Sequence, residues 1–219
     1  DIFAVKDVSA LDDDRLSHMV AELLRLQKKD RQENQILYYK PTQPGSLRVM
    51  ASKARIVGIG GGNRSSKTTT AMVRWVSLAT GVMPLDEDVR EALMPHFKGP
   101  LRVRVVVESI TNTLVPVILP KLRYTSWSGL PPYGGDKGHW GWIPRMCLID
   151  GDWSKSWSEK NRMLTVLCRD PENPERILGK STVQFNSFDQ DPADFASGDF
   201  DIVHEDEPPP HAIHRENEA

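Results

Sequence analysis

The stretch "GIGGGNRSSKTTTA", residues 58–71, decides how the rest of the chain is interpreted. It follows an apolar run over 55–59 and precedes a periodic apolar stretch that Gly81 ends. We therefore predict a short strand over 55–59, a glycine turn, and a helix over 67–80. This order is typical of a phosphate-binding loop, because the N–H groups of the turn and of the helix N-terminus together bind anionic oxygens.

The stretch matches the phosphate-loop pattern G-x-x-x-x-G-K followed by Ser or Thr, except that Ser66 replaces the second glycine. Lys67 and Thr68 then stand where a lysine meets the β- and γ-phosphates and a hydroxyl meets Mg²⁺. Serine is small and fits if the turn keeps a negative φ at this position. The alternative is an ordinary packing turn. The residues predicted to bind nucleotide here are Gly60, Gly61, Gly62, Asn63, Arg64, Ser65, Ser66, Lys67, Thr68 and Thr69.

A second candidate element is the acidic run in "DFDIVHEDEPPP", which follows an apolar strand near the end of the chain. Ligands gather at the carboxyl ends of parallel strands, so we assign Asp206 to Mg²⁺ and Glu207 to the attacking water. A shifted register makes Glu205 the metal ligand and Asp206 the catalytic carboxylate. A plain acidic turn ahead of the prolines is the other alternative. The nearby pair His211 and His214 lacks a third ligand and is interpreted as a solvated helix start.

The remaining patterns favour an α/β fold. An amphipathic helix is predicted over about 10–33, and the segment "YYKPTQPGS" breaks it. Strands are predicted over 101–107, 163–168 and 181–187, and two prolines make any helix over 111–123 short or kinked. Strands that alternate with helices indicate a largely parallel sheet. A loop-rich insertion is predicted at about 124–160. It holds five tryptophans, which we expect to pack around a small satellite core: Trp127, Trp140, Trp142, Trp153 and Trp157.

Composition restricts the class of protein. The formal net charge is −2, and no apolar stretch approaches the roughly 20 residues needed to span a bilayer. The sequence therefore predicts a soluble cytosolic protein with no membrane association. Cys147 and Cys168 have no metal-site spacing and are predicted to be free thiols. We divide the chain into an N-terminal helical segment, 1–40, and a main domain, 41–219.

The motifs "GGNRSSKTTT" and "DEPPP", with the helix that begins near "AI", resemble the ATPase domain of large terminase subunits, the DNA-packaging motors of tailed bacteriophages. The resemblance covers residues 41–80 and 181–215. It implies a P-loop NTPase of the additional-strand, catalytic-glutamate class, with a mainly parallel sheet flanked by helices. It also implies an ATPase that powers translocation of double-stranded DNA into a procapsid.

The resemblance further implies ATP and Mg²⁺ as cofactors, a homo-oligomeric ring, and the host cytoplasm as location. Its implied partners are double-stranded DNA, a portal protein and a small terminase subunit. Gln43 is the candidate for the family's adenine contact. Lys67 and Glu207 take catalytic roles, as does Arg64, although a structural pairing of Arg64 with a carboxylate is equally open.

Two departures from the family concern Ser66 and the end of the chain. The sequence stops soon after the acidic run, so we expect an incomplete ATPase domain without the coupling motif or the nuclease activity of the family. Two alternative functions stay open. One is a nucleotide-binding assembly module without turnover, and the other is a helicase-like repair ATPase.

Overall fold

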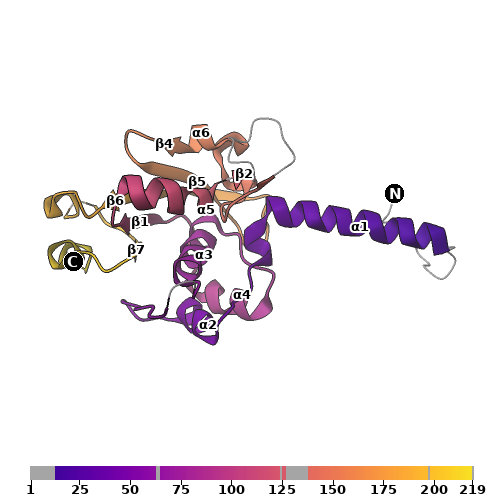
Figure 1. Ribbon diagram of the computed structural model, residues 1–219, viewed down its shortest axis with the longest axis horizontal. Coiled ribbons are helices and arrows are strands. Elements are labelled where there is room, and N and C mark those ends of the chain that lie inside the picture. Colours follow the sequence, from indigo (N-terminus) through magenta and orange to yellow (C-terminus); the bar gives the residue numbers. More distant parts are fainter. Residues whose placement is uncertain (1–12, 63–64, 124, 127–137, 197, 219) are drawn as a thin grey trace.

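A five-stranded sheet organises the chain, with strand order β4-β5-β6-β1-β7 (Figure 1). The computed structural model describes residues 13–62, 65–123, 125–126, 138–196 and 198–218. The sheet strands are β1 (Arg102–Val107), β4 (Trp157–Ser158), β5 (Met163–Arg169), β6 (Ile177–Ser187) and β7 (Ile202–Glu205). A separate two-stranded sheet pairs β2 (Thr125–Ser126) with β3 (Gly138–His139).

The sheet is mixed, which corrects the prediction of a mainly parallel one. β1 pairs in parallel with β6 and β7, whereas β5 pairs antiparallel with both β4 and β6. The short connection 170–176 explains the difference, because a parallel crossover needs a dozen or more residues and a hairpin does not. Asp170 N–H donates to the Arg176 carbonyl at 2.9 Å and closes this hairpin. The fold is therefore α/β, with helices that flank a mixed sheet.

β1 is the most completely buried strand of the sheet. Val103, Val105 and Val107 join the main core, while Val106 joins a second cluster with Phe195 and Ile213. Successive side chains of a strand point to opposite faces, so both faces of β1 are covered. This burial explains why the run "RVRVVV" alternates only weakly and becomes continuously apolar, as expected for a strand enclosed on both sides.

The helices follow the sequence predictions in most places. The amphipathic helix is described from residue 13 onward, and its predicted first residues lie outside the described part of the chain. The helix over 67–80 is confirmed, and Gly81 ends it with φ 72°. The α-helices are α1 (Asp13–Glu33), α2 (Pro44–Ala51), α3 (Lys67–Thr80), α4 (Glu87–Leu93), α5 (Leu119–Leu122), α6 (Trp153–Ser156) and α7 (His211–Glu218).

One of the short helical segments is a π-helix that contains a proline. η5 (Ile110–Ile118) is a π-helix that contains Pro116 and leads directly into α5. A helix therefore forms over most of the range 111–123, and its first part is π-helical. The remaining short helices are η3 (Gln35–Tyr38), η4 (Met94–His96), η6 (Arg145–Cys147), η7 (Ile149–Gly151) and η8 (Pro192–Asp194). Within the described residues, every helix is too short or too polar to cross a bilayer.

The predicted strand over 55–59 does not form. Residues 52–60 have no regular secondary structure, and Ile56 is 59% exposed. Gly58 and Gly60 weaken an extended backbone, and a strand gains its stability from a hydrogen-bonded neighbour that this segment lacks. The glycine turn is therefore entered from an irregular segment.

The loop-rich insertion packs onto the main core, which corrects the expected satellite core. Trp140, Trp142, Trp153 and Trp157 all pack against the large apolar cluster. Trp157 meets Phe185 of β6 edge-on, with ring centroids 5.6 Å apart. Trp127 lies outside the described residues. Cys147 and Cys168 are buried free thiols, as predicted.

Gly81 tests the junction between α3 and β5. A Cβ atom added there would lie 1.8 Å from the carbonyl oxygen of Arg169, and φ is in the left-handed region. We expect Gly81→Ala to lower the free energy of unfolding by more than about 2 kcal/mol, because it combines backbone strain with overlap. Urea denaturation measures this change. Gly58→Ala, which meets nothing within 4 Å, is the control. Equal effects of the two substitutions would refute the described junction.

Candidate nucleotide-binding site

The glycine loop turns sharply into α3 at Ser66. This residue has φ 61° and ψ 20°, so the negative φ on which its fit depended is absent. Left-handed backbone is the conformation that a glycine at this position of the pattern would adopt without cost. The carbonyl of Ser66 accepts the first helical hydrogen bond, from Thr70 N–H at 2.8 Å. The serine therefore reproduces the turn but holds backbone strain.

Lys67 folds back over the loop. Its Nζ donates to the carbonyl of Gly61 at 2.6 Å, so the lysine and the glycines lie together. A Cβ atom at Gly61 would lie 2.8 Å from Ser65 Oγ, which explains the glycine there. Ser65 Oγ is itself buried and has no hydrogen-bond partner in the described part of the chain. Asn63 and Arg64, both predicted site residues, lie outside the described residues.

Two contacts fix the direction of α3 across the sheet. Near the helix C-terminus, Ser181 Oγ of β6 donates to the Ala79 carbonyl at 2.6 Å. One turn earlier, Trp75 Nε1 donates to His204 Nδ1 of β7 at 3.3 Å. In the parallel register, His204 of β7 aligns with Val105 of β1, and Val105 aligns with Phe185 of β6. Ser181 comes four residues before Phe185 on β6, so it lies nearer than His204 to the amino ends of the parallel strands. α3 therefore runs antiparallel to β6, β1 and β7.

This orientation places the loop at the carboxyl edge of the sheet. Thr68 lies seven residues before Trp75, which is about 10 Å along a helix. Asp206 lies two residues beyond His204, which is about 7 Å along a strand. The start of α3 and the acidic run after β7 therefore reach the same edge. The first N–H groups of α3 have no intrahelical acceptor and point out of the helix there.

The three acids at the end of β7, Glu205, Asp206 and Glu207, differ in their surroundings. Glu205 accepts from His214 Nδ1 at 2.9 Å and from Asn217 Nδ2 at 2.8 Å, which ties it to α7. Asp206 is 10% exposed, and its Oδ1 has no hydrogen-bond partner in the described chain. Glu207 is exposed. Asp206 is thus the carboxylate with unused acceptor capacity, and this favours the register in which Asp206 holds the metal.

His204 connects α3 to this acidic run. Its Nδ1 accepts from Trp75, and its Nε2 lies 3.8 Å from Asp206 Oδ1. Burial lowers the pKa of His204 to about 4, and the carboxylate of Asp206 opposes this shift only in part. The imidazole is therefore neutral at pH 7 and can face Asp206 with an N–H group, because Nδ1 acts as the acceptor.

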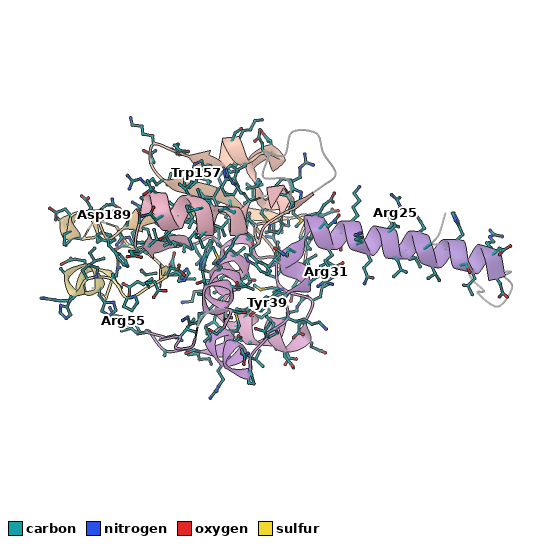
Figure 2. The ribbon with its side chains drawn as sticks, in the orientation of Figure 1. Arg25, Arg31, Tyr39, Arg55, Trp157 and Asp189 are labelled. Carbon is teal, nitrogen blue, oxygen red and sulfur yellow. The ribbon has the colours of Figure 1, made fainter. Side chains whose placement is uncertain are left out.

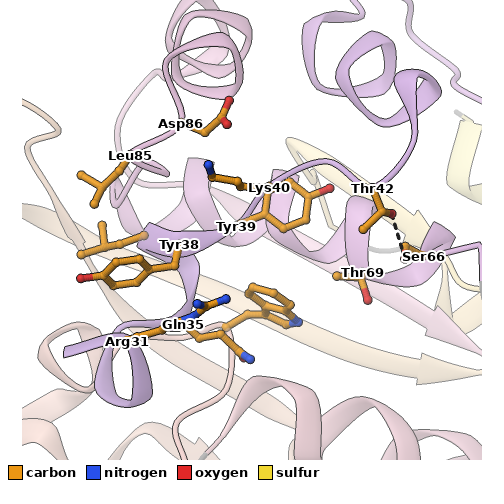
Figure 3. Close-up of a pocket in the computed structure, with 12 residues that line it drawn as sticks. Arg31, Gln35, Tyr38, Tyr39, Lys40, Thr42, Ser66, Thr69, Leu85 and Asp86 are labelled. Atoms are coloured by element: carbon orange, nitrogen blue, oxygen red, sulfur yellow. Dashed lines mark hydrogen bonds between the residues drawn. The ribbon is translucent and has the colours of Figure 1, made fainter. Parts of the chain in front are cut away.

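A cavity of about 740 Å³ adjoins the loop (Figure 3). Thr42 Oγ1 donates to Ser66 Oγ at 3.2 Å where the cavity meets the loop. Tyr39 and Trp142 meet edge-on along its wall, with ring centroids 5.9 Å apart. The lining residues are Arg31, Gln35, Leu37, Tyr38, Tyr39, Lys40, Thr42, Ser66, Thr69, Leu85, Asp86 and Trp142.

The structure brings together most, but not all, of the predicted residues. Thr68 and Thr69 form the first turn of α3, and the glycines 60–62 precede it as exposed backbone. Gln43 is the exposed residue before α2 and does not line the cavity. Sequence reasoning missed the aromatic wall, although "YYK" directly before the break contains Tyr38 and Tyr39.

The oxygen donors at this edge suit a Mg²⁺ ion that is bound together with a nucleotide. Among the described residues, they do not form a metal site made of protein ligands alone. The described residues contain no group of three or more His, Cys, Asp or Glu side chains that could hold a metal ion. Nucleotide-bound Mg²⁺ needs no such group, since phosphates and waters supply most of its ligands. One hydroxyl and one carboxylate suffice, and the buried Asp206 Oδ1, which has no hydrogen-bond partner in the described part of the chain, is a hard oxygen donor of the required kind.

No protein-family model, curated protein or solved structure matches this chain. The functional assignment therefore depends on the geometry of the loop, the acidic run and the cavity.

Ser66 gives a direct test of the loop geometry. We expect Ser66→Gly to raise the free energy of unfolding by up to about 1 kcal/mol, because relief of left-handed strain exceeds the entropic cost of glycine. Urea denaturation measures the change. Ser52→Gly is the control, since Ser52 has φ −64° and gains no relief. A loss of stability of the same size in both variants would contradict the strained turn.

His204 predicts a pH dependence of stability. Its folded pKa lies below the unfolded value of about 6.5, so stability is complete above that pH and falls as the pH drops toward 4. Between pH 7 and pH 5 the titration of this residue should lower the free energy of unfolding by about 2 kcal/mol. The His204→Gln variant keeps an acceptor for Trp75 but does not titrate. Its free energy of unfolding, measured by urea denaturation, should therefore fall by about 2 kcal/mol less over the same interval. An identical pH dependence would exclude a buried neutral histidine.

Proposed function

We propose that the chain is an ATP-binding and ATP-hydrolysing domain. The observation that carries the proposal is the arrangement at the carboxyl edge of the sheet. There, a glycine loop turns at Ser66 into the N-terminus of α3, and Asp206 directly follows the strand β7 at the same edge. Backbone N–H groups at a helix N-terminus favour phosphate oxygens through both hydrogen bonding and the helix dipole.

Lys67 adds the mobile positive charge that a triphosphate requires. Its present acceptor is the Gly61 carbonyl, an exposed hydrogen bond that a phosphate oxygen would replace with a stronger, charge-assisted one. The glycines 60–62 keep side chains away from the approaching phosphates. Ser65 Oγ, buried and without an acceptor in the described chain, adds a donor that phosphate binding can use.

The adjoining cavity is proposed to hold the base and the sugar. Its volume lies within the range of about 300–1,000 Å³ that small-molecule sites occupy. Aromatic rings of Tyr38, Tyr39 and Trp142 supply apolar surface for a purine, and Arg31 and Lys40 supply positive charge. Ser66 at the end of the loop and Thr69 in the first turn of α3 also line the cavity, so one nucleotide can occupy the loop and the cavity continuously.

The acidic run supplies the second half of the proposed chemistry. Thr68 and Asp206 would hold Mg²⁺, which neutralises charge on the phosphates when it is bound. His204 keeps the backbone around Asp206 in register with α3 through its hydrogen bond to Trp75. Glu207 is exposed, so its carboxylate oxygens can accept a hydrogen bond from the attacking water. Arg64 stays the candidate for added positive charge in the transition state.

At the level of biological role, we propose a DNA-packaging motor of the large-terminase type. The support is the resemblance of the loop and of the "DEPPP" run, together with the α/β architecture. Double-stranded DNA, a portal protein and a small terminase subunit are the proposed partners, and a ring is the proposed assembly. The α/β mixed sheet is equally compatible with an assembly module that binds ATP without turnover, so stimulation by DNA is the discriminating measurement.

Substitution of the two proposed catalytic residues should separate binding from turnover. We expect Lys67→Ala to weaken ATP binding and to abolish hydrolysis, because the phosphates lose their point charge. We expect Glu207→Gln to retain ATP binding while kcat falls by at least about 100-fold, because the water loses its acceptor. Fluorescent ATP-analogue titration measures binding, and steady-state phosphate release with and without double-stranded DNA measures turnover.

Lys53→Ala is the matched control, since Lys53 is an exposed lysine in the segment that precedes the loop. It should behave as the unsubstituted chain in both assays. Turnover in Glu207→Gln at the unsubstituted rate would refute the assignment of Glu207. ATP binding without any phosphate release from the unsubstituted chain would favour the assembly module.

A further inference from the structure

α1 exposes an apolar surface that nothing in the described chain covers. The helix extends away from the sheet and the other helices (Figure 1), and none of its residues is buried. The exposed apolar side chains are Leu16 at 37%, Val20 at 47%, Leu23 at 44%, Leu24 at 60% and Leu26 at 39%. A soluble chain rarely leaves such a group together in water without a partner.

The spacing of these side chains is that of a pairing helix. Leu16, Val20 and Leu23 recur at intervals of four and three residues, and Gln27 continues the same row. Val20, Leu23, Leu24 and Gln27 together line a shallow hollow on the helix surface. This surface, defined by Leu16, Val20, Leu23, Leu24 and Gln27, is called the α1 stripe below.

α1 is held to the body only near its C-terminal end in the described structure. The Gln32 carbonyl accepts from Trp140 N–H at 2.8 Å, and Tyr38 OH donates to the carboxylate of Asp30. The preceding turns extend beyond these contacts, and Figure 2 shows Arg25 on this projecting part of the helix. Most helical stability in proteins comes from tertiary packing of an apolar face, so a packing partner would stabilise the projecting part of α1.

Charge along α1 specifies which partner fits. Residues 13–22 contain three carboxylates and one arginine, whereas residues 23–33 contain four Lys or Arg and two carboxylates. The N-terminal half is therefore acidic and the C-terminal half basic. A second α1 in antiparallel orientation would place each half against its opposite, and a parallel one would place like against like. Antiparallel helix dipoles add to this preference.

We propose that α1 is an interaction surface for α1 of a second copy of this chain, paired antiparallel along the α1 stripe. Such a contact is isologous, because one surface meets itself around a two-fold axis. Val20 and Leu23 lie near the middle of the helix and would form the centre of the contact. Asp13 and Asp14 would approach Lys28 and Lys29 of the other copy. The proposal is independent of nucleotide binding.

Sedimentation equilibrium of the full chain over a range of concentrations tests the proposal. We expect a monomer–dimer equilibrium that weakens as salt is raised, since charge contributes to the contact. The double variant Val20→Glu with Leu23→Glu should be monomeric throughout. Ile177→Glu is the control, because Ile177 is also 51% exposed but lies on β6. An unsubstituted chain that stays monomeric at every concentration would overturn the proposal.

A charge exchange tests the orientation. Lys28→Glu with Lys29→Glu should weaken dimerisation at least about tenfold, because both halves of α1 become acidic. Addition of Asp13→Lys and Asp14→Lys should restore it, since the halves are again opposite. In a parallel pair the fourfold variant would still place like charges together, so failure of the restoration overturns the antiparallel arrangement. Unchanged thermal unfolding of the body in all variants shows that folding is not the cause.

Discussion

The packing of α3 onto the sheet is the constraint on which the rest of the structure depends. Met72, Trp75, Val76 and Ala79 are buried in the same core as the odd-numbered valines of β1. Ser181 and His204 add polar contacts to α3 from the neighbouring strands β6 and β7. Because these contacts set the direction of the helix, its N-terminus and the glycine loop are carried to the edge where β7 ends.

The loop is held more firmly from its helical side than from its leading side. No strand leads into it, and residues 52–60 are irregular. Arg74 of α3 donates to the carbonyls of Val49 and Ser52 at 2.6 and 2.8 Å, which secures the start of that segment. Beyond it, the left-handed Ser66 and the bond from Lys67 to Gly61 define the turn. The shape of the site therefore depends on a strained residue and on one exposed hydrogen bond.

Several elements followed from sequence because their causes are local. The helix 67–80 begins at the polar "SSK" and ends at Gly81, and the buried strand 102–107 has an apolar run of its own. The hairpin of β5 and β6 was mistaken for part of a parallel sheet, although its short connection already implied antiparallel pairing. The predicted strand 55–59 does not form, because a strand needs a hydrogen-bonded neighbour from elsewhere in the chain. The local sequence pattern does not reveal whether such a neighbour is present.

The sequence by itself determined the identity of the loop residues and of the acids, because lysine, threonine, glycine and aspartate carry their chemistry in their own side chains and backbone. Only the tertiary structure decided which of them meet. In the tertiary structure Glu205 bonds to α7, whereas Asp206 Oδ1 has no hydrogen-bond partner among the described residues. The cavity is assembled from α1, η3, α3 and Trp142, and Gln43 lies outside it. The physical reason is that residues distant along the chain become neighbours only when α3 packs against the sheet.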